Sequence, residues 1–176
     1  MKIANETVVS LAYKMYVTNE EGQELIDANP QLANINLIYP GDEIKVPTQE
    51  GAAVEQEVLR LVNVERANAG LSALQNDLEL ARVAEDKSQD MHDKGYFSHT
   101  SPTYGSPFDM MKNYGITYKS AGENIAQGQK TAAAVVDAWM NSEGHRANIL
   151  NAKYTHMGVG YVKDGNYWTQ MFIQKK

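Results

Sequence analysis

Two histidines and one glutamate have the types and spacing that could support chemistry in this sequence. His99 and His145 each follow a helix-like segment, and Glu123 lies between them in a strand-like segment. Two imidazoles and a carboxylate are the ligand types of an open zinc site, where three protein groups leave a position for water. The same set could form a metal-free acid–base pair, or make ordinary loop hydrogen bonds. Spacing does not separate these alternatives, because the chain has no HExxH motif.

Other chemistry-bearing residues are weaker candidates. We expect His92 on a helix and His156 at a turn to be surface residues. Ser98 beside His99 suggests a Ser-His-Glu hydrolase, but neighbours in sequence seldom reach nucleophile–base geometry, and no Gly-x-Ser-x-Gly motif is present. The chain has no cysteine, which excludes disulfides, thiolate metal sites and a cysteine nucleophile.

Composition narrows the class of protein and its partners. The chain has 176 residues and a net charge of −6, with 43% hydrophobic and 22% charged residues, as in ordinary globular domains. Its acidic first 50 residues and near-neutral remainder argue against a nucleic-acid partner. No apolar run approaches the ~18–20 residues of a membrane span. The first residues, Met1 to Glu6, lack the pattern of a secretion signal.

Proline and glycine divide the chain into two expected modules. The polar stretch from Pro47 to Ala52 separates two periodic regions, so we expect a module at 1–47, a linker at 48–53 and a domain at 54–176. The pattern of the first module is β-α-α-β. In the second we expect helices near 54–68, 76–94, 106–113 and 131–140, and strands near 122–126, 158–162 and 167–173.

Local signals mark where these elements begin and turn. Asp164-Gly165 between two alternating segments predicts a hairpin. Helix starts are predicted at Asn76 with Glu79, at Ser106 with Pro107, and at Thr131. This order of elements predicts an α+β fold in which helices cover a small, mostly antiparallel sheet, an α-β-α sandwich.

Four motifs carry a resemblance over residues 54–173. They are Phe97-Ser98-His99, Gly122-Glu123-Asn124-Ile125-Ala126, the segment from Trp139 to Leu150, and Met157-Gly158-Val159-Gly160. In order and spacing this part of the chain resembles the bacterial branch of the CAP superfamily, which includes cysteine-rich secretory, antigen 5 and pathogenesis-related 1 proteins. The resemblance implies a CAP-like α-β-α sandwich with a cleft lined by two histidines and two acidic residues. In some members that cleft binds a divalent metal.

The family's cleft residues carry over to positions of this chain. The two histidines correspond to His99 and His145, and the first acid corresponds to Glu123. The second acid has no clear equivalent, since Ser142 and Glu143 occupy the region where it would lie, and only Glu143 supplies a carboxylate. The resemblance therefore implies zinc or another divalent metal as the expected cofactor, or a cleft for another ligand.

Residues 1–47 resemble a LysM module, a β-α-α-β unit that binds glycans containing N-acetylglucosamine. The resemblance rests on the segments 6–12, 24–32 and 36–47, and the chain has Ala4-Asn5-Glu6-Thr7 where the family has Pro-Gly-Asp-Thr. A docking module without sugar affinity is the alternative. The resemblance to LysM implies seven glycan-binding residues, which are Asn5, Glu6, Thr7, Asn29, Pro30, Gln31 and Leu32.

Together the two modules predict a protein of the bacterial cell wall or spore envelope. The LysM-like module would anchor the chain to peptidoglycan or a chitin-like glycan, and the CAP-like domain would present the His/Glu cleft. A module of this kind at the N-terminus suggests the spore coat by analogy. The alternatives are a metal-dependent hydrolase of envelope peptide or glycan, and a non-catalytic scaffold or lipid-binding module. The sequence leaves the oligomeric state open.

Overall fold

Strand β4 (Tyr167–Lys175) lies at the centre of the domain, because its residues from Tyr167 to Ile173 are all buried. A strand with one face in solvent would alternate buried and exposed residues, so both faces of this strand must be covered. The computed structural model describes residues 50–176. The module predicted at 1–47, with its seven candidate glycan-binding residues, lies outside the described residues.

The sheet has four strands in the order β1-β3-β4-β2. β2 (Tyr118–Gln127) and β3 (His156–Val162) both pair antiparallel with β4, and the two-residue β1 (Gln75–Asn76) pairs parallel with β3. The expected strands are therefore present, and β2 is longer than the predicted 122–126. β2 lies at one edge of the sheet, which matters for the site described below.

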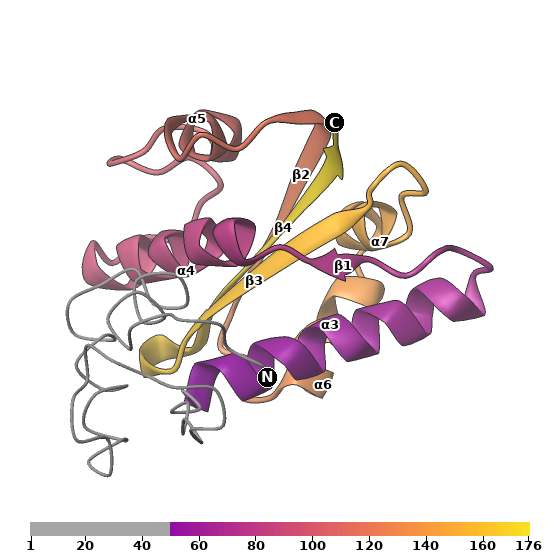
Figure 1. Ribbon diagram of the computed structural model, residues 1–176. Helices are drawn as coiled ribbons and strands as arrows, with labels where there is room; N and C mark the ends of the chain where they lie inside the picture. The colour runs from indigo at the N-terminus through magenta and orange to yellow at the C-terminus, as the bar shows by residue number, and fades with distance from the viewer. Residues whose placement is uncertain (1–49) are drawn as a thin grey trace, which may run out of the picture. The chain divides into compact units, whose positions relative to one another are not determined.

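Helices cover both faces of this sheet (Figure 1). α4 (Leu78–Asp93) and α5 (Pro107–Asn113) pack on one face, while α3 (Glu50–Asn68), α6 (Ala132–Met140) and α7 (Glu143–Ile149) pack on the other. Each face of the sheet has its own hydrophobic core, and the side chains of β4 point alternately into one and the other. Trp168 and Phe172 face the α3 side, and Met171 and Ile173 face the α4 side. The predicted α-β-α sandwich is confirmed.

Glycines in β3 let α4 approach the sheet closely. A Cβ atom at Gly158 would lie 2.2 Å from the backbone nitrogen of Ala81, and one at Gly160 would lie 2.1 Å from that of Glu85. These neighbours are helix backbone atoms, which cannot rotate away as a side chain can. The Gly-x-Gly spacing therefore sets the distance between α4 and β3.

Two of the three predicted helix starts are confirmed, and one is shifted. Ser106 forms a reciprocal capping box with Asp109, and the Thr131 side chain accepts a hydrogen bond from the Ala134 amide. α4 is capped by Asp77 instead of Asn76, which was the prediction. The reason is that Asn76 belongs to β1 and pairs with β3, so the helix can begin only after it.

Two further expectations need correction. α3 begins at Glu50, inside the predicted linker 48–53. α7 was not predicted, and its presence places His145 in a helix instead of a loop. The hairpin predicted around Asp164-Gly165 is confirmed, since β3 and β4 pair antiparallel on either side of it, and its turn contains a 3-10 segment with positive φ at Gly165 and Asn166. No helix in residues 50–176 is long and apolar enough to cross a membrane.

Candidate functional site

The candidate site lies at the edge of the sheet, where two neighbouring residues of β2 hold segments from opposite layers. Successive side chains of a strand point to opposite faces. Glu123 contacts His99, in the segment that follows α4, while Asn124 donates a hydrogen bond of 3.1 Å to the carbonyl of His145 in α7. The two histidines, 46 positions apart in sequence, are thus anchored at consecutive residues of one strand.

His99 and Glu123 form the central contact of the site. His99 Nδ1 lies 2.6 Å from Glu123 Oε1, and an ionised carboxylate only accepts, so we assign the hydrogen to Nδ1. The glutamate side chain is 1% exposed while the imidazole is 53% exposed. Burial raises the pKa of Glu123, although the hydrogen bond from His99 and the nearby charge of Lys87 oppose this. The same hydrogen bond raises the pKa of His99. Since Nδ1 is held by the carboxylate, Nε2 is the ring nitrogen left for a ligand.

The second carboxylate oxygen of Glu123 is a buried acceptor with unused capacity. Oε2 has no hydrogen-bond partner among the residues that the structure describes. A buried carboxylate oxygen without a donor is unfavourable, by roughly 1–3 kcal/mol or more. A ligand that brings an N–H or O–H group to this oxygen would remove that cost.

His145 has the opposite electrostatic character to His99. Its partial burial lowers its pKa, and repulsion from the charge of His99 lowers the pKa further. The two imidazoles therefore lie close enough for the charge of one to affect the other. At neutral pH a larger fraction of His145 than of His99 is therefore uncharged. The uncharged imidazole offers a lone pair to a proton or a metal.

Amide side chains fix α7 against the edge of β2. Asn148 Nδ2 donates to the carbonyl of Glu123 at 3.1 Å and to Asn124 Oδ1 at 2.9 Å, and Asn124 also donates to Gln170 at 3.0 Å. Trp139 Nε1 donates to the carbonyl of Ile125 at 3.2 Å. These contacts occupy edge carbonyls of β2 that would otherwise be open to another strand. Asn124, Ile125, Trp139 and Asn148 all belong to the motifs that carry the resemblance to the CAP superfamily.

Glu143, the candidate second acid, lies two residues before His145 in α7. It lies exposed in the first turn of α7, where a negative charge interacts favourably with the helix dipole. Among the described residues, the groups that shift the pKa values of His99 and His145 do not include Glu143. The role of Glu143 as a cleft residue stays a prediction, and Ser142 precedes it as the N-cap of α7 without a capping hydrogen bond.

The weaker candidates His92, His156 and Ser98 make no contact with the His99–Glu123 pair among the hydrogen bonds of the described residues. His92 is bonded to Asp93 and Asp164 on the surface, and His156 lies beside Thr155 at the start of β3. Ser98 Oγ accepts a hydrogen bond from the Thr100 amide. The structure thus provides no Ser-His pairing for nucleophilic catalysis among the described residues.

Sequence reasoning missed two charged residues beneath the His99 segment. Lys87 and Asp90 are buried in α4, with 1% and 8% of their surface exposed. Their signal was present in the sequence, because Lys87 is seven residues after the buried Leu80 and four before the buried Met91, on the apolar side of the helix. A charge at such a position needs buried partners, and the segment after α4 supplies them.

The His99–Glu123 contact has the form found around a metal-binding histidine. A histidine that binds metal usually donates its other ring N–H to a carboxylate, and the contact between His99 and Glu123 has this form. However, residues 50–176 contain no group of three or more histidine, aspartate or glutamate side chains arranged to hold a metal ion. His99 Nε2 and His145 would therefore hold a divalent metal with other positions left to water or ligand. Metal binding stays a prediction.

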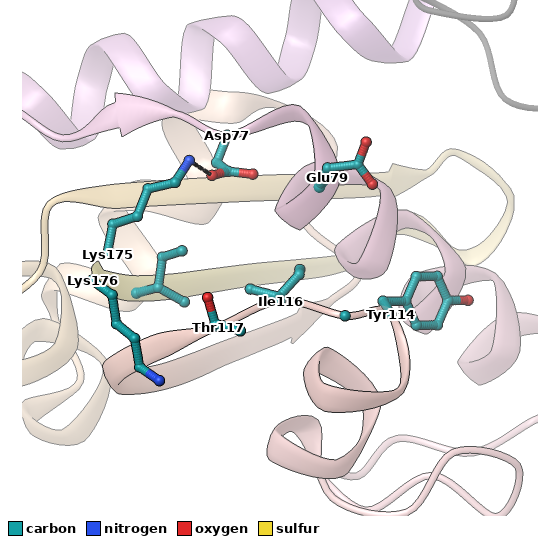
Figure 2. Close-up of a pocket in the computed structure, with 9 residues that line it drawn as sticks. Asp77, Glu79, Tyr114, Ile116, Thr117, Lys175 and Lys176 are labelled. Atoms are coloured by element: carbon teal, nitrogen blue, oxygen red, sulfur yellow. Dashed lines mark hydrogen bonds and ion pairs between the residues drawn. The ribbon is translucent and has the colours of Figure 1, made fainter.

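A pocket elsewhere in the domain is separate from this site (Figure 2). It has a volume of about 430 Å³ and lies where the N-terminus of α4 meets the ends of β2 and β4. Lys175 Nζ and Asp77 Oδ2 form an ion pair of 2.8 Å at its rim, which Figure 2 marks with a dashed line. None of the four candidate cleft residues lines it. Its size alone would suggest a ligand site, but the groups that could do chemistry lie elsewhere.

The fold and the site define a small α-β-α sandwich with a histidine–glutamate pair at the sheet edge and a second histidine in the helix held against that edge. The model of the CAP family, described as the cysteine-rich secretory protein family, matches residues 59–175. The chain therefore belongs to this family, although it has no cysteine. The match does not extend to residues 1–47.

Bacterial relatives are similar over the same domain. The Bacillus subtilis protein YkwD is 64% identical over 124 residues, which cover 70% of this chain and 48% of the relative. The Bacillus subtilis membrane protein YlbC is 45% identical over 121 residues, covering 69% of this chain and 34% of the relative. The chain thus spans less than half the length of these two curated relatives.

Solved structures show the same fold. An extracellular protein with an SCP domain from Bacillus anthracis has a TM-score of 0.69 and 34% identity, covering 87% of this chain and 50% of that one. A cysteine-rich secretory protein from Staphylococcus aureus has a TM-score of 0.62 and 22% identity, covering 87% and 48%. The second likeness is one of fold alone.

Proposed function

We propose that this protein acts in the bacterial cell envelope and that its CAP domain binds a ligand or a divalent metal through His99 and His145. The observation that carries the proposal is the 2.6 Å hydrogen bond from His99 to the buried Glu123. It orients one imidazole with Nε2 free, while the lowered pKa of His145 keeps the other imidazole neutral. A bound metal would act there as a Lewis acid, and Glu123 would hold His99 in position.

The envelope location and the glycan anchor are parts of the same proposal. The relative from Bacillus anthracis is described as extracellular, which supports an envelope location for this chain. The LysM-like pattern of residues 1–47 supports anchoring to peptidoglycan through Asn5, Glu6, Thr7 and the segment Asn29–Leu32. The spore coat is one such location.

Zinc titration tests the cleft. We expect the full chain to bind zinc near pH 7.5 in calorimetry, and His99→Ala or His145→Ala to abolish binding because each removes one of two imidazole donors. His92→Ala is the matched control, since His92 is bonded to surface aspartates and should leave binding unchanged. Zinc uptake that is equal in all four proteins would disprove the metal proposal.

Sedimentation with insoluble peptidoglycan tests the anchor. We expect the full chain to be retained and a chain without residues 1–47 to stay in solution. The variant Gln31→Ala in the full chain keeps the module present and should weaken retention if that loop contacts glycan. Equal retention of all three proteins would contradict anchoring by this module.

A second candidate function is metal-dependent hydrolysis of envelope peptide or glycan. One feature favours it, the unpartnered Oε2 of the buried Glu123, since this oxygen could accept a proton from water while the two imidazoles hold the metal. Zinc hydrolases commonly use three protein ligands, and only two imidazoles are available here. Binding is therefore ranked above catalysis. Release of soluble fragments from peptidoglycan, lost in His145→Ala but not in His92→Ala, would reverse this ranking.

A further inference from the structure

Lys87 is a buried lysine directly beneath the His99 segment. It is 1% exposed, and its Nζ donates to the main-chain carbonyl of His99 at 2.9 Å and to Tyr96 Oη at 3.3 Å. Nζ also lies 5.1 Å from the centre of the Tyr96 ring. A buried ammonium group is unfavourable unless its donors are used, so these contacts are what allow the residue to be here.

Asp90, almost one turn further along α4, holds the rest of the segment. Tyr96 and Ser101 each donate a hydroxyl hydrogen bond of 2.6 Å to Asp90 Oδ2, and Thr103 donates to Oδ1. Lys94 adds an ion pair of 3.0 Å. Residues 96–103, which we call the His99 loop, are therefore attached to α4 at both ends by Asp90 and in the middle by Lys87.

Lys87 also acts on Glu123 from the α4 side of the sheet. Its charge attracts the buried carboxylates of Glu123 and Asp90, which opposes the lowering of its pKa by burial. In return the ammonium favours the ionised form of Glu123, the form that accepts the hydrogen bond from His99. One side chain thus contacts the backbone of His99 and stabilises the acceptor of its imidazole.

We propose that Lys87 is the positioning residue of the site, which holds the His99 carbonyl so that Nδ1–H meets Glu123 and Nε2 stays free for a ligand. This inference rests on the proposed function only for the identity of the ligand that binds at Nε2. The positioning role of Lys87 does not depend on a ligand, because it predicts the tautomer of His99 in the free protein. Lys87 touches no ligand itself.

The test compares three variants of the full chain. Lys87→Met removes the charge and the donor at similar length, and Lys87→Gln removes the charge but keeps an N–H donor. Lys112→Met removes a lysine from the exposed side of α5 and is the matched control. The tautomer of His99 is measured from its ring ¹⁵N shifts at about pH 9, where imidazoles are neutral, and zinc affinity is measured by calorimetry.

We expect His99 to be in the Nδ1–H form in the parent protein and in Lys112→Met. In Lys87→Met we expect a mixture with the Nε2–H form, and zinc affinity lower by about 10- to 100-fold, as is usual when the support of a ligating histidine is lost. Lys87→Gln should lie between them. A purely structural role would lower stability to urea but leave the tautomer of the folded protein unchanged, and that result would overturn the proposal.

The outcomes separate this inference from the proposed function. If the parent protein binds no zinc but Lys87→Met changes the tautomer, the metal function fails and the positioning role stands. If the parent binds zinc and both Lys87 variants keep its affinity and tautomer, the positioning role fails alone. Should Lys87→Met not fold, Lys87→Gln decides the question, because it leaves a hydrogen-bond donor in the buried position.

Discussion

The two faces of the sheet are packed in different ways, and each supplies one histidine of the site. On the α4 face, glycines bring helix backbone against β3, and the His99 loop is held by the buried charges Lys87 and Asp90. On the other face, large side chains fill the space, and α7 is held by neutral amides such as Asn124. Charged contacts on one side and amide contacts on the other should make the two histidines respond differently to mutation and pH.

The largest effect is expected from Trp139→Ala on the side-chain-packed face. Trp139 is 1% exposed, and its removal leaves a cavity that we expect to cost about 4 kcal/mol of unfolding free energy. Urea denaturation measures this loss. Nuclear magnetic resonance should show the signals of His145 shifted and those of His99 nearly unchanged.

The variant Trp139→Phe separates packing from the hydrogen bond to the carbonyl of Ile125. It keeps much of the ring volume and loses only the donor, so we expect about 1–2 kcal/mol. A loss as large as that of the alanine variant would mean that closure of the β2 edge matters more than packing.

The next effect is expected from Gly160→Ala on the other face. The added Cβ would lie 2.1 Å from the backbone nitrogen of Glu85, so α4 must move and we expect a loss of about 3 kcal/mol. Here the His99 signals should shift and those of His145 should not. Gly144→Ala in α7 is the matched control, because no atom lies within 4 Å of its Cβ position. Equal stabilities of the two variants would contradict the close approach of α4.

A smaller effect is expected from Asn124→Ala, which removes the amide that holds α7. It removes the donor to the His145 carbonyl and to Gln170 Oε1, for a loss of about 2 kcal/mol. The exposed Asn113→Ala, at the end of α5, should change stability by less than about 0.5 kcal/mol. Hydrogen exchange of the α7 amides should increase only in the first variant, and unchanged exchange would mean that α7 is held by other contacts.

The smallest effect is the pH response of the two imidazoles. The pKa of His99 is raised above 6.5 by its hydrogen bond to Glu123, so the stabilisation from this pair is present below pH 6.5 and is lost as pH rises through the folded pKa. The pKa of His145 is lowered by burial, so its contribution is present above pH 6.5 and is lost as pH falls through the folded pKa.

Histidine ring signals followed across pH 5 to 9 should therefore show His145 titrating first as pH rises and His99 later. In Glu123→Gln the carboxylate is gone, so the pKa of His99 should fall. A common midpoint for His99 and His145 would contradict the difference between the two faces.

Much of the fold could be predicted because its signals are local. Ser106 with Asp109, and Thr131 with the amide of Ala134, make capping contacts within one turn, so the sequence pattern contains both partners. α7 was not predicted because it lacks such local signals. It has seven residues, begins at Glu143 without a capping hydrogen bond and buries only Ile149, so it lacks a cap and an apolar stripe that a pattern could show.

The site could be predicted in its residue types but not in its connections. The family-like motifs indicated His99, Glu123 and His145, and the structure brings His99 and Glu123 into contact. The same motifs left Glu143 as the candidate second acid, and the structure places it exposed in the first turn of α7. Lys87 has no motif at all, since its partners are a backbone carbonyl and a tyrosine in the following loop.

Composition, periodicity and capping patterns were enough to define a cysteine-free α-β-α domain with two histidines and a glutamate in separate segments. Such features depend on residues within a turn or two of each other, where spacing and geometry are directly related. The meeting of those segments at the β2 edge and the burial of Lys87 depend on residues from 12 to 46 positions apart. Contacts at that separation arise from packing of the whole sheet against its helices, which a linear pattern does not contain.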